Sequence, residues 1–358
     1  MTDVAALAGV SCATVSRALR DDPRISPGVR ECVKKAALEV AYHPNPLVQA
    51  LMSQRRRKQD LHGESIALVT SVDEREWRKK DVCRWYWQGL SRRAEELGYQ
   101  LQVLCLKDIH DNSARMKQVL EARGIRGVIL GFSQPDDRTE RLDVSSFCVV
   151  GLSTYFQRLA VDRVQLHGFY NVKLAFRQMR ALGYKRPALI APVRNNAIVG
   201  GQWSAAALDE QWQRPADEQC PPLMIEGETV NMRLFREWFE KHKPDALLVY
   251  KICVMELLER LRLQVPNDVG IAYLFGTESE RSSMAGIDGS LDRVGAATVD
   301  LLVQKMHVHE HGMPEHPREV LITGDWRHGP TLPERLQPAH SSQRPAGKRS
   351  GSPAPLSR

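Results

Sequence analysis

Two short helices are encoded in Asp3-Val-Ala-Ala-Leu-Ala-Gly-Val-Ser-Cys-Ala-Thr-Val-Ser-Arg-Ala-Leu19. The first begins at Thr2, carries apolar residues at helical spacing and ends at Gly9. Ser11 is a preferred N-cap residue for a second helix over 12–19. Because the link between them is so short, the two helices are expected to cross steeply, which is the helix-turn-helix arrangement.

A third helix is predicted to follow Ser26-Pro27, because serine is a preferred N-cap and proline fits the first helical position. Its apolar stripe consists of Val29, Val33, Ala36, Ala37 and Val40. These helices form a small all-α module over residues 1–43. The simplest alternative is a three-helix bundle with no nucleic-acid role.

The second helix exposes small side chains around a single arginine. Arginine is the side chain that most often reads guanine O6 and N7 through a bidentate bond, and serine and threonine hydroxyls can hold phosphates. We therefore expect this helix to enter the major groove of DNA. The predicted contacts are Ser11, Cys12, Ala13, Thr14, Ser16 and Arg17.

The segment 44–62 combines a short helix with a basic cluster. Asn45-Pro46 opens a helix over 47–53, which is too short to be stable by itself. Arg55-Arg56-Arg57-Lys58 follows it. Such a cluster is either a solvated linker or a phosphate contact.

These features together resemble the DNA-binding headpiece of the lactose repressor (LacI/GalR) family. The resemblance rests on the stretch quoted first, on Ile25-Ser-Pro27, on Tyr42-His-Pro-Asn45 and on Ala50-Leu51. It implies that the second helix reads an operator in the major groove. It also implies a hinge helix that forms on binding as a dimer pair.

In the resembling family, a leucine of the hinge helix wedges into the minor groove, and Leu51 corresponds to it. The contacts implied for this segment are Asn45, Val48, Leu51, Arg55 and Arg56. Pro46 and Val48 stand where the family often has alanine, and Ala41 replaces a common glycine.

The composition is that of a globular chain. Its 358 residues are 42% hydrophobic and 26% charged, enough for two or three domains. No apolar stretch approaches the roughly 18 residues of a membrane span, and residues 1–20 lack the pattern of a secretory signal. The seven cysteines are scattered without a C-x-x-C pair, which is typical of reduced thiols. We therefore expect a cytoplasmic, nucleoid-associated protein.

The net charge of +7 lies at the ends of the chain. Residues 1–62 carry 10 basic and 6 acidic side chains, and residues 333–358 carry 5 and 1. A nearly neutral body between basic ends indicates that a polyanion binds at the ends. The last 26 residues are rich in proline and serine, which predicts a disordered basic tail without a tetramerising helix.

The body, residues 63–332, alternates apolar runs with amphipathic stretches, which predicts α/β architecture with parallel sheets covered by helices. A helix is expected over 83–97, with Trp87, Leu90, Ala94 and Leu97 on one face. The expected strands are 65–70, 101–106, 127–132, 147–152, 187–191, 245–250 and 269–274. This length favours two Rossmann-like lobes with a cleft between them.

The family resemblance extends into the body through shorter motifs. These are Glu95-Glu-Leu-Gly-Tyr99, Arg126-Gly-Val-Ile-Leu130, Leu182-Gly-Tyr-Lys-Arg186, Val265-Pro-Asn-Asp-Val-Gly270 and Gly324-Asp-Trp-Arg-His-Gly329. They resemble landmarks of the family's effector domain. The resemblance implies a two-lobed, periplasmic-binding-protein-like fold, a ligand in the cleft and a homodimer.

The sugar-contacting positions depart from the family pattern, which commonly has Asp-Asn, an arginine and an acidic pair. This chain has Arg163, Gln202 and Phe275-Gly276 instead. Without a buried carboxylate, sugar hydroxyls would be poorly paired, which disfavours a standard sugar effector. The predicted cleft-lining residues are Trp77, Asp162, Arg163, Arg194, Gln202 and Trp203. Aromatic faces with few polar groups suit an apolar or ring-shaped ligand, although tryptophans are also common in cores.

Catalytic, cofactor and metal chemistry finds little support in the sequence. No G-x-G-x-x-G loop, P-loop or G-x-S-x-G motif occurs, so no enzyme and no cofactor are predicted. His307 and His311 could share a helix face, but a solvated helix end is the favoured interpretation over a metal site.

The sequence thus predicts a sequence-specific transcription regulator, a repressor, controlled by a small molecule between two lobes. A homodimer on a near-palindromic operator is expected, because two-fold symmetry doubles a short readout. One alternative is a soluble ligand-binding protein of transport type, which would need a signal peptide and no headpiece. Another is an α/β enzyme, which would need an acid/base pair or a cofactor loop.

Overall fold

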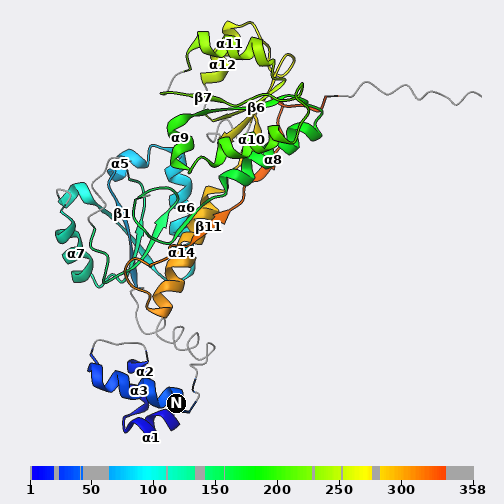
Figure 1. The fold of residues 1–358 in the computed structure, drawn as a ribbon. Helices are drawn as coiled ribbons and strands as arrows, with labels where there is room; N and C mark the ends of the chain where they lie inside the picture. The colour runs from blue at the N-terminus through cyan, green and yellow to red at the C-terminus, as the bar shows by residue number, and fades with distance from the viewer. Residues whose placement is uncertain are drawn as a thin grey trace, which may run out of the picture.

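The computed structural model describes residues 2–19, 24–40, 42, 64–109, 112–133, 142–156, 158–227, 230–250, 253–275 and 283–335. They form a three-helix headpiece and a body with two six-stranded sheets (Figure 1). We call the body's sheet regions lobe 1 and lobe 2, in the order in which the chain first enters them.

The headpiece contains α1 (Thr2–Ala8), α2 (Cys12–Ala18) and α3 (Pro27–Glu39), which confirms the three predicted helices. Its core consists of small apolar side chains from all three helices, namely Val4, Ala5, Val15, Ala18, Val33, Ala36 and Ala37. Pro27 occupies the start of α3 as predicted, whereas the Ser26 side chain forms no capping bond there. Small side chains let the helices approach closely enough to form a core in so short a module.

Lobe 1 is a parallel sheet in the order β11-β5-β4-β3-β1-β2. Its strands are β1 (Ser65–Thr70), β2 (Gln100–Cys105), β3 (Gly127–Leu130), β4 (Cys148–Leu152), β5 (Arg163–Leu166) and β11 (Glu319–Ile322). Its helices are α5 (Glu74–Trp77), α6 (Asp81–Glu96), η1 (Leu106–Ile109), α7 (Ser113–Ala122) and α14 (Leu291–Val308). The central strands are buried throughout, as expected for a parallel sheet covered on both faces.

Lobe 2 has the order β12-β10-β9-β8-β6-β7, with only β12 antiparallel to its neighbour. Its strands are β6 (Pro187–Pro192), β7 (Leu223–Ile225), β8 (Ala246–Tyr250), β9 (Gly270–Phe275), β10 (Ala285–Asp288) and β12 (Asp325–Arg327). Its helices are α8 (Gly168–Ala181), α9 (Val193–Ile198), α10 (Gln202–Trp212), α11 (Met232–His242) and α12 (Cys253–Arg260).

The chain passes between the lobes three times: from β5 into α8, from β10 into α14, and from β11 into β12. The carboxyl ends of β5 and β10 therefore both lie at the junction of the lobes. Because their neighbours in each sheet run parallel to them, the carboxyl edges of the two sheets face each other there. In open α/β sheets this is the edge at which ligands bind.

Two glycines allow α6 and α14 to pack closely in lobe 1. A β-carbon at Gly89 would overlap the backbone carbonyl of Asp292, and one at Gly295 would overlap the carbonyl of Tyr86. Beside this contact, the Arg93 guanidinium pairs with Asp300 at 2.7 Å. The backbones of the two helices thus pack at a distance that only glycine permits, and an ion pair lies at the edge of this contact.

Pro333 and Arg335, which belong to the predicted tail, contact lobe 2. The Tyr184 hydroxyl donates to the Pro333 carbonyl at 3.1 Å, and the Arg335 guanidinium lies 4.4 Å from the centre of the Tyr184 ring. Residues 336–358 lie outside the described residues.

A membrane-spanning helix would need more length and more apolar character than any helix in the described ranges has.

Candidate DNA-binding face and effector cleft

The candidate DNA-binding face lies on α2. Val15 and Ala18 are buried against the other headpiece helices, which turns the opposite side of α2 outward. Cys12, Ala13 and Arg17 are exposed on that side. An exposed arginine among small side chains can approach base edges in a major groove without a steric barrier.

The start of α2 is capped as predicted. The Ser11 hydroxyl accepts a hydrogen bond from the Thr14 backbone N–H at 3.1 Å and lies 2.9 Å from the Thr14 hydroxyl. Both side chains therefore have partners within the helix, and they fix where α2 begins. Ser16 lies in α2, but its side chain is outside the described part of the structure.

The other predicted DNA contacts fall in the segment that links headpiece and body. Asn45, Val48, Leu51, Arg55 and Arg56 lie outside the described residues, as does the predicted hinge helix over 47–53. Their roles remain predictions.

Aromatic side chains of lobe 1 gather at the carboxyl edge of its sheet. The Trp77 ring lies 4.6 Å from that of Phe132, which in turn lies 5.5 Å from Tyr155. Trp77 and Phe132 are almost completely buried. All three follow directly or closely after a strand of the parallel sheet, so the topology brings them together.

Lobe 2 contributes a second aromatic group to the same junction. The Trp203 ring lies 4.9 Å from Tyr250 and 5.9 Å from Phe275. Phe275 packs against the hydrophobic cores of both lobes. We call Trp77, Phe132, Tyr155, Trp203, Tyr250 and Phe275 the aromatic cleft.

Tyr250 of lobe 2 lies close enough to Tyr86 and Tyr155 of lobe 1 to affect their pKa values. Burial is the main cause of the raised pKa of Tyr155 and Tyr86, and the nearby Tyr250 of lobe 2 raises both pKa values further. These hydroxyls therefore stay neutral at physiological pH. They can donate hydrogen bonds but contribute no charge to the cleft.

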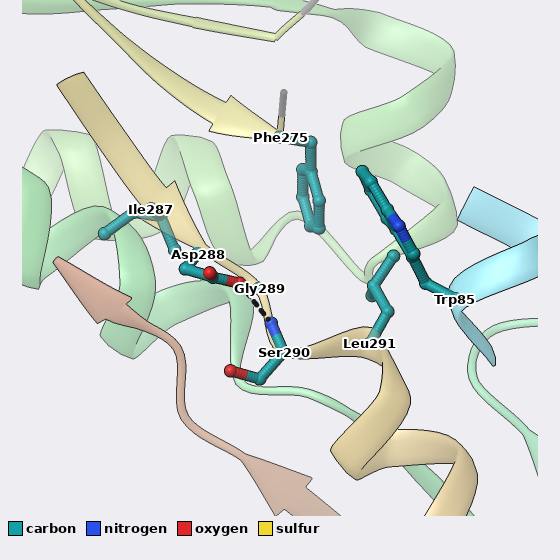
Figure 2. A pocket seen from close by; sticks show the side chains of 7 residues that line it. All are labelled: Trp85, Phe275, Ile287, Asp288, Gly289, Ser290 and Leu291. Carbon is teal, nitrogen blue, oxygen red and sulfur yellow. Dashed lines mark hydrogen bonds between the residues drawn. The ribbon is translucent and has the colours of Figure 1, made fainter. Parts of the chain in front are cut away.

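A small pocket lies beside the aromatic cleft (Figure 2). It is lined by Trp85, Phe275, Ile287, Asp288, Gly289, Ser290 and Leu291. Figure 2 shows the Phe275 and Trp85 rings approaching each other from the two lobes. The space left for solvent is about 10 Å³, roughly that of one water molecule. This pocket is thus nearly filled by the protein's own side chains.

Three predicted effector residues lie in or beside the cleft. Trp77 and Trp203 belong to it, and the Gln202 side-chain carbonyl accepts from the Phe169 backbone N–H at 3.2 Å. Gln202 therefore fixes the start of α8 where the chain crosses between lobes. Arg194 is exposed on α9, the helix whose Asn195 donates to the Tyr250 hydroxyl at 3.1 Å.

The structure corrects the prediction for Asp162 and Arg163, which lie at the opposite edge of lobe 1. Both stand at the amino end of β5, whereas the junction lies at its carboxyl end, where His167 follows. The Arg163 guanidinium donates to the Leu159 carbonyl at 2.9 Å. The prediction failed because it assigned a family motif to the beginning of a strand rather than to its end.

Asp162 instead forms an ion cluster in which it and Lys305 are buried, whereas Glu310 and Arg318 are partly exposed. Its carboxylate accepts from the Lys305 ammonium and from the Arg318 guanidinium, each at 2.6 Å. Glu310 pairs with the same two cations at 2.5 and 3.1 Å. Burial alone would raise the pKa of Asp162, but the bonds from Arg318 and Lys305 outweigh it and lower the pKa to about 2. Asp162 is therefore ionised at neutral pH, and its pair with Lys305 joins β5 to α14.

Sequence reasoning missed Trp85 and Tyr250, and it noted Phe275 at a sugar-contacting position without predicting that it lines the site. Tyr250 and Phe275 are the last residues of β8 and β9. An aromatic residue at the end of an apolar run could therefore have indicated them from the sequence. Trp85 carried no such signal, because its role depends on which face of α6 meets lobe 2.

The histidines near the end of α14 do not form a metal site within the described part of the chain. The His309 and His311 rings stack at 6.2 Å, and no group of three or more potential ligands occurs among the described residues.

Comparison with known proteins agrees with this geometry. The family described as "Bacterial regulatory proteins, lacI family" matches residues 1–45, the region that forms the headpiece. The headpiece of this chain is therefore similar to that of LacI-family proteins.

The curated proteins to which this chain is similar carry regulator names. The chain is 26% identical over 201 residues to the HTH-type transcriptional regulator MalR of Streptococcus pneumoniae, an alignment that covers 54% of this chain and 59% of MalR. It is 24% identical over 318 residues to CelR of Thermobifida fusca, covering 85% and 90%. It is 27% identical over 291 residues to the catabolite repressor/activator of Escherichia coli K12, covering 76% and 80%.

Solved structures share the fold. The lac repressor dimer bound to operator and the anti-inducer ONPF aligns with a TM-score of 0.55 at 20% identity, covering 92% of this chain and 98% of that one. A CelR–cellobiose complex aligns with a TM-score of 0.55 at 19% identity over the same shares. These matches show the two-lobed fold with its headpiece.

Proposed function

We propose that this protein is a LacI-family, sequence-specific DNA-binding transcription regulator that acts as a repressor. The observation that carries the proposal is the capped α2 helix, which presents exposed Arg17 on a headpiece of the family type. A repressor is favoured because a headpiece dimer on an operator acts most simply by occlusion. The regulator names of three groups of relatives support the proposal.

We further propose that a small-molecule effector binds between the lobes and controls DNA affinity. The support is the facing carboxyl edges of two parallel sheets, together with the three crossings about which the lobes can move. Among structural relatives, CelR is described with cellobiose bound. Regulation, rather than catalysis or transport, is thus the role assigned to the cleft, and the protein would act on DNA in the cytoplasm.

A gel-shift experiment tests the proposal directly. The full chain and a variant lacking residues 1–62 are titrated onto the DNA upstream of the protein's own gene and onto random DNA. The full chain is expected to shift the upstream DNA at lower concentration, and the shortened chain to shift neither. Equal binding by both chains would exclude the headpiece as the DNA-binding unit, and no preference for the upstream DNA would remove sequence-specific control at that site.

Arg17→Ala is expected to lower operator affinity by about 1–3 kcal/mol and to lower random-DNA affinity much less, because a bidentate guanine contact discriminates among bases. Lys35→Ala removes the same charge from an exposed position on α3 and serves as the matched control. The measurement is a pair of binding isotherms at fixed salt. Equal losses on both DNAs would mean that Arg17 only contacts phosphate.

Leu51→Ala is expected to reduce operator affinity and DNA bending, because an apolar wedge unstacks a base step. The segment 47–53 should also gain amide protection only when operator is added, since two helical turns cannot offset their nucleation cost in water. Exchange and bending assays on the full chain measure both effects. Strong protection without DNA would refute folding on binding, and normal bending by the variant would refute the wedge.

We also propose a homodimer on a near-palindromic operator, since one headpiece contacts few base pairs. The lac repressor structure is described as a dimer bound to operator. Sedimentation of the full chain with and without operator tests this part. A monomer under both conditions would contradict it.

A further inference from the structure

We propose that the aromatic cleft takes a flat aromatic ligand that carries a hydrogen-bond acceptor, in preference to a sugar. The inference rests on the proposed function, because it names the chemical class of the effector that would bind between the lobes. Three observations support this inference. Aromatic rings flank the junction, its polar acceptors already form hydrogen bonds within the protein, and two buried indole N–H groups have no partner among the described residues.

Aromatic rings from both lobes flank the junction, and Phe275 of this group lines the small pocket there together with Trp85. Ring centres in lobe 1 lie 4.6 and 5.5 Å apart, and those in lobe 2 lie 4.9, 5.7 and 5.9 Å apart. These separations are the ones at which aromatic pairs attract each other by offset or edge-to-face contact. A flat ring entering the cleft would find the same partners, whereas a sugar would expose its hydroxyls to them.

The polar acceptors at the junction already have partners within the protein. Asp288 accepts from the Ser290 backbone N–H at 3.0 Å, and Gln202 accepts from Phe169 at 3.2 Å. The Tyr86 hydroxyl donates to Ser153 at 3.0 Å. A sugar brings many hydroxyl donors, and these groups offer them only the acceptor sites that their internal bonds leave free.

Two indole N–H groups of the cleft have no partner among the described residues. They belong to Trp77 and Trp203, which are 1% and 3% exposed. A buried donor without an acceptor is unfavourable. A ligand that offers an acceptor to either indole N–H would therefore gain binding free energy. Beside Trp203, a β-carbon at position 168 would lie 3.0 Å from the indole nitrogen, and Gly168 leaves that position open.

The charge of the cleft walls points the same way. Burial raises the pKa of the tyrosines and keeps them neutral, and the Arg78 guanidinium is stacked on Trp77 and Trp87, 4.8 Å from each ring. Arg78 is also paired with Glu74 at 2.6 Å. A ligand without net charge therefore fits better than a phosphate or a carboxylate.

Entry of such a ligand requires the lobes to separate. The pocket between Trp85 and Phe275 leaves about 10 Å³ for solvent, which is far less than one aromatic ring. Since Phe275 packs against both lobes, a bound ring would take over its contact with lobe 1. Binding would thus change the relative position of the lobes, as an effector must.

The experiment uses coumarin, a flat bicyclic lactone with a carbonyl acceptor, and cellobiose as a hydroxyl-rich comparison. Each is titrated calorimetrically into the full chain. Trp203→Phe keeps the ring but removes the N–H, and Trp212→Phe makes the same change at an exposed position of the same helix, where the side chain is 87% exposed. The melting temperature of each variant shows whether it is folded.

Coumarin is expected to bind saturably with one site per chain, about fivefold more weakly to Trp203→Phe and equally well to Trp212→Phe. Cellobiose should give no saturable heat. Tighter binding of cellobiose than of coumarin, no saturable coumarin binding, or unchanged binding by folded Trp203→Phe would each overturn the inference.

Failure of this inference and failure of the proposed function give different results. Operator binding without coumarin binding leaves the regulator intact and removes only the ligand class. Coumarin binding by a protein that shifts no DNA would leave the cleft assignment standing and remove the proposed regulatory role.

Discussion

Gly89→Ala is expected to destabilise the body by more than about 3 kcal/mol, because the added methyl would overlap the Asp292 carbonyl and push α14 away from α6. In an isolated helix the same change stabilises by about 1 kcal/mol. The clash should reverse that sign, since a backbone atom cannot move aside as a flexible side chain can. Chemical unfolding followed by tryptophan fluorescence measures the loss.

Gly28→Ala is the control for this prediction. Gly28 lies in α3, and a β-carbon there would meet nothing within 4 Å. It should leave the body unchanged and stabilise the headpiece slightly. Equal stability of the Gly89 variant and the natural protein would mean that α6 and α14 are farther apart in solution than the structure shows.

Lys305→Met is expected to destabilise the body by about 3 kcal/mol, because it leaves the buried Asp162 carboxylate with the partly exposed Arg318 as its remaining cation. Lys305 is 1% exposed, so water cannot replace the lost partner. Because Met fills much of the same volume as Lys, the loss of stability measures the effect of removing the charge and not of changing the packing. Lys117→Met, at a more exposed ion pair with Asp143, should have a far smaller effect.

The same cluster predicts how stability depends on pH. The pKa of Asp162 is about 2 in the folded protein, below its ordinary value of about 3.9 in an unfolded chain. Its contribution, on the order of 2–3 kcal/mol, is therefore fully present above about pH 5 and is lost progressively as the pH falls through the folded pKa. Asp162→Asn should reduce the slope of the unfolding free energy against pH over this range. An unchanged slope would mean that other groups cause the acid sensitivity.

The elements that could be predicted from sequence are those whose signal is local. The headpiece helices have caps, and strands such as β1 and β8 are continuous apolar runs that fit the buried interior of a parallel sheet. By contrast, β5, β10 and β12 contain charged residues and only three or four positions, so no periodicity marks them. They become strands because longer neighbours supply hydrogen-bonding edges.

The site was predicted less completely than the fold, for a related reason. Gln202 and Trp203 lie near the junction because α10 begins soon after β6 ends, with only the short α9 between them, an order that can be read along the chain. Asp162 was misplaced by one strand length, since sequence alone does not show which end of β5 meets the other lobe. The pairing of Trp85 with Phe275 depends on lobe closure, which has no local signature.

The three crossings also determine the order in which the protein can mature during its synthesis. Lobe 1 is built from residues 65–166 together with α14 and β11, which a ribosome delivers only after nearly all of lobe 2. Until residue 308 emerges, the glycine face of α6 has no partner and the cations of the Asp162 cluster are absent. Lobe 2, apart from β12, can fold earlier, because its central strands come from one continuous segment. A nascent chain would therefore carry a finished headpiece well before it has a body able to respond to a ligand.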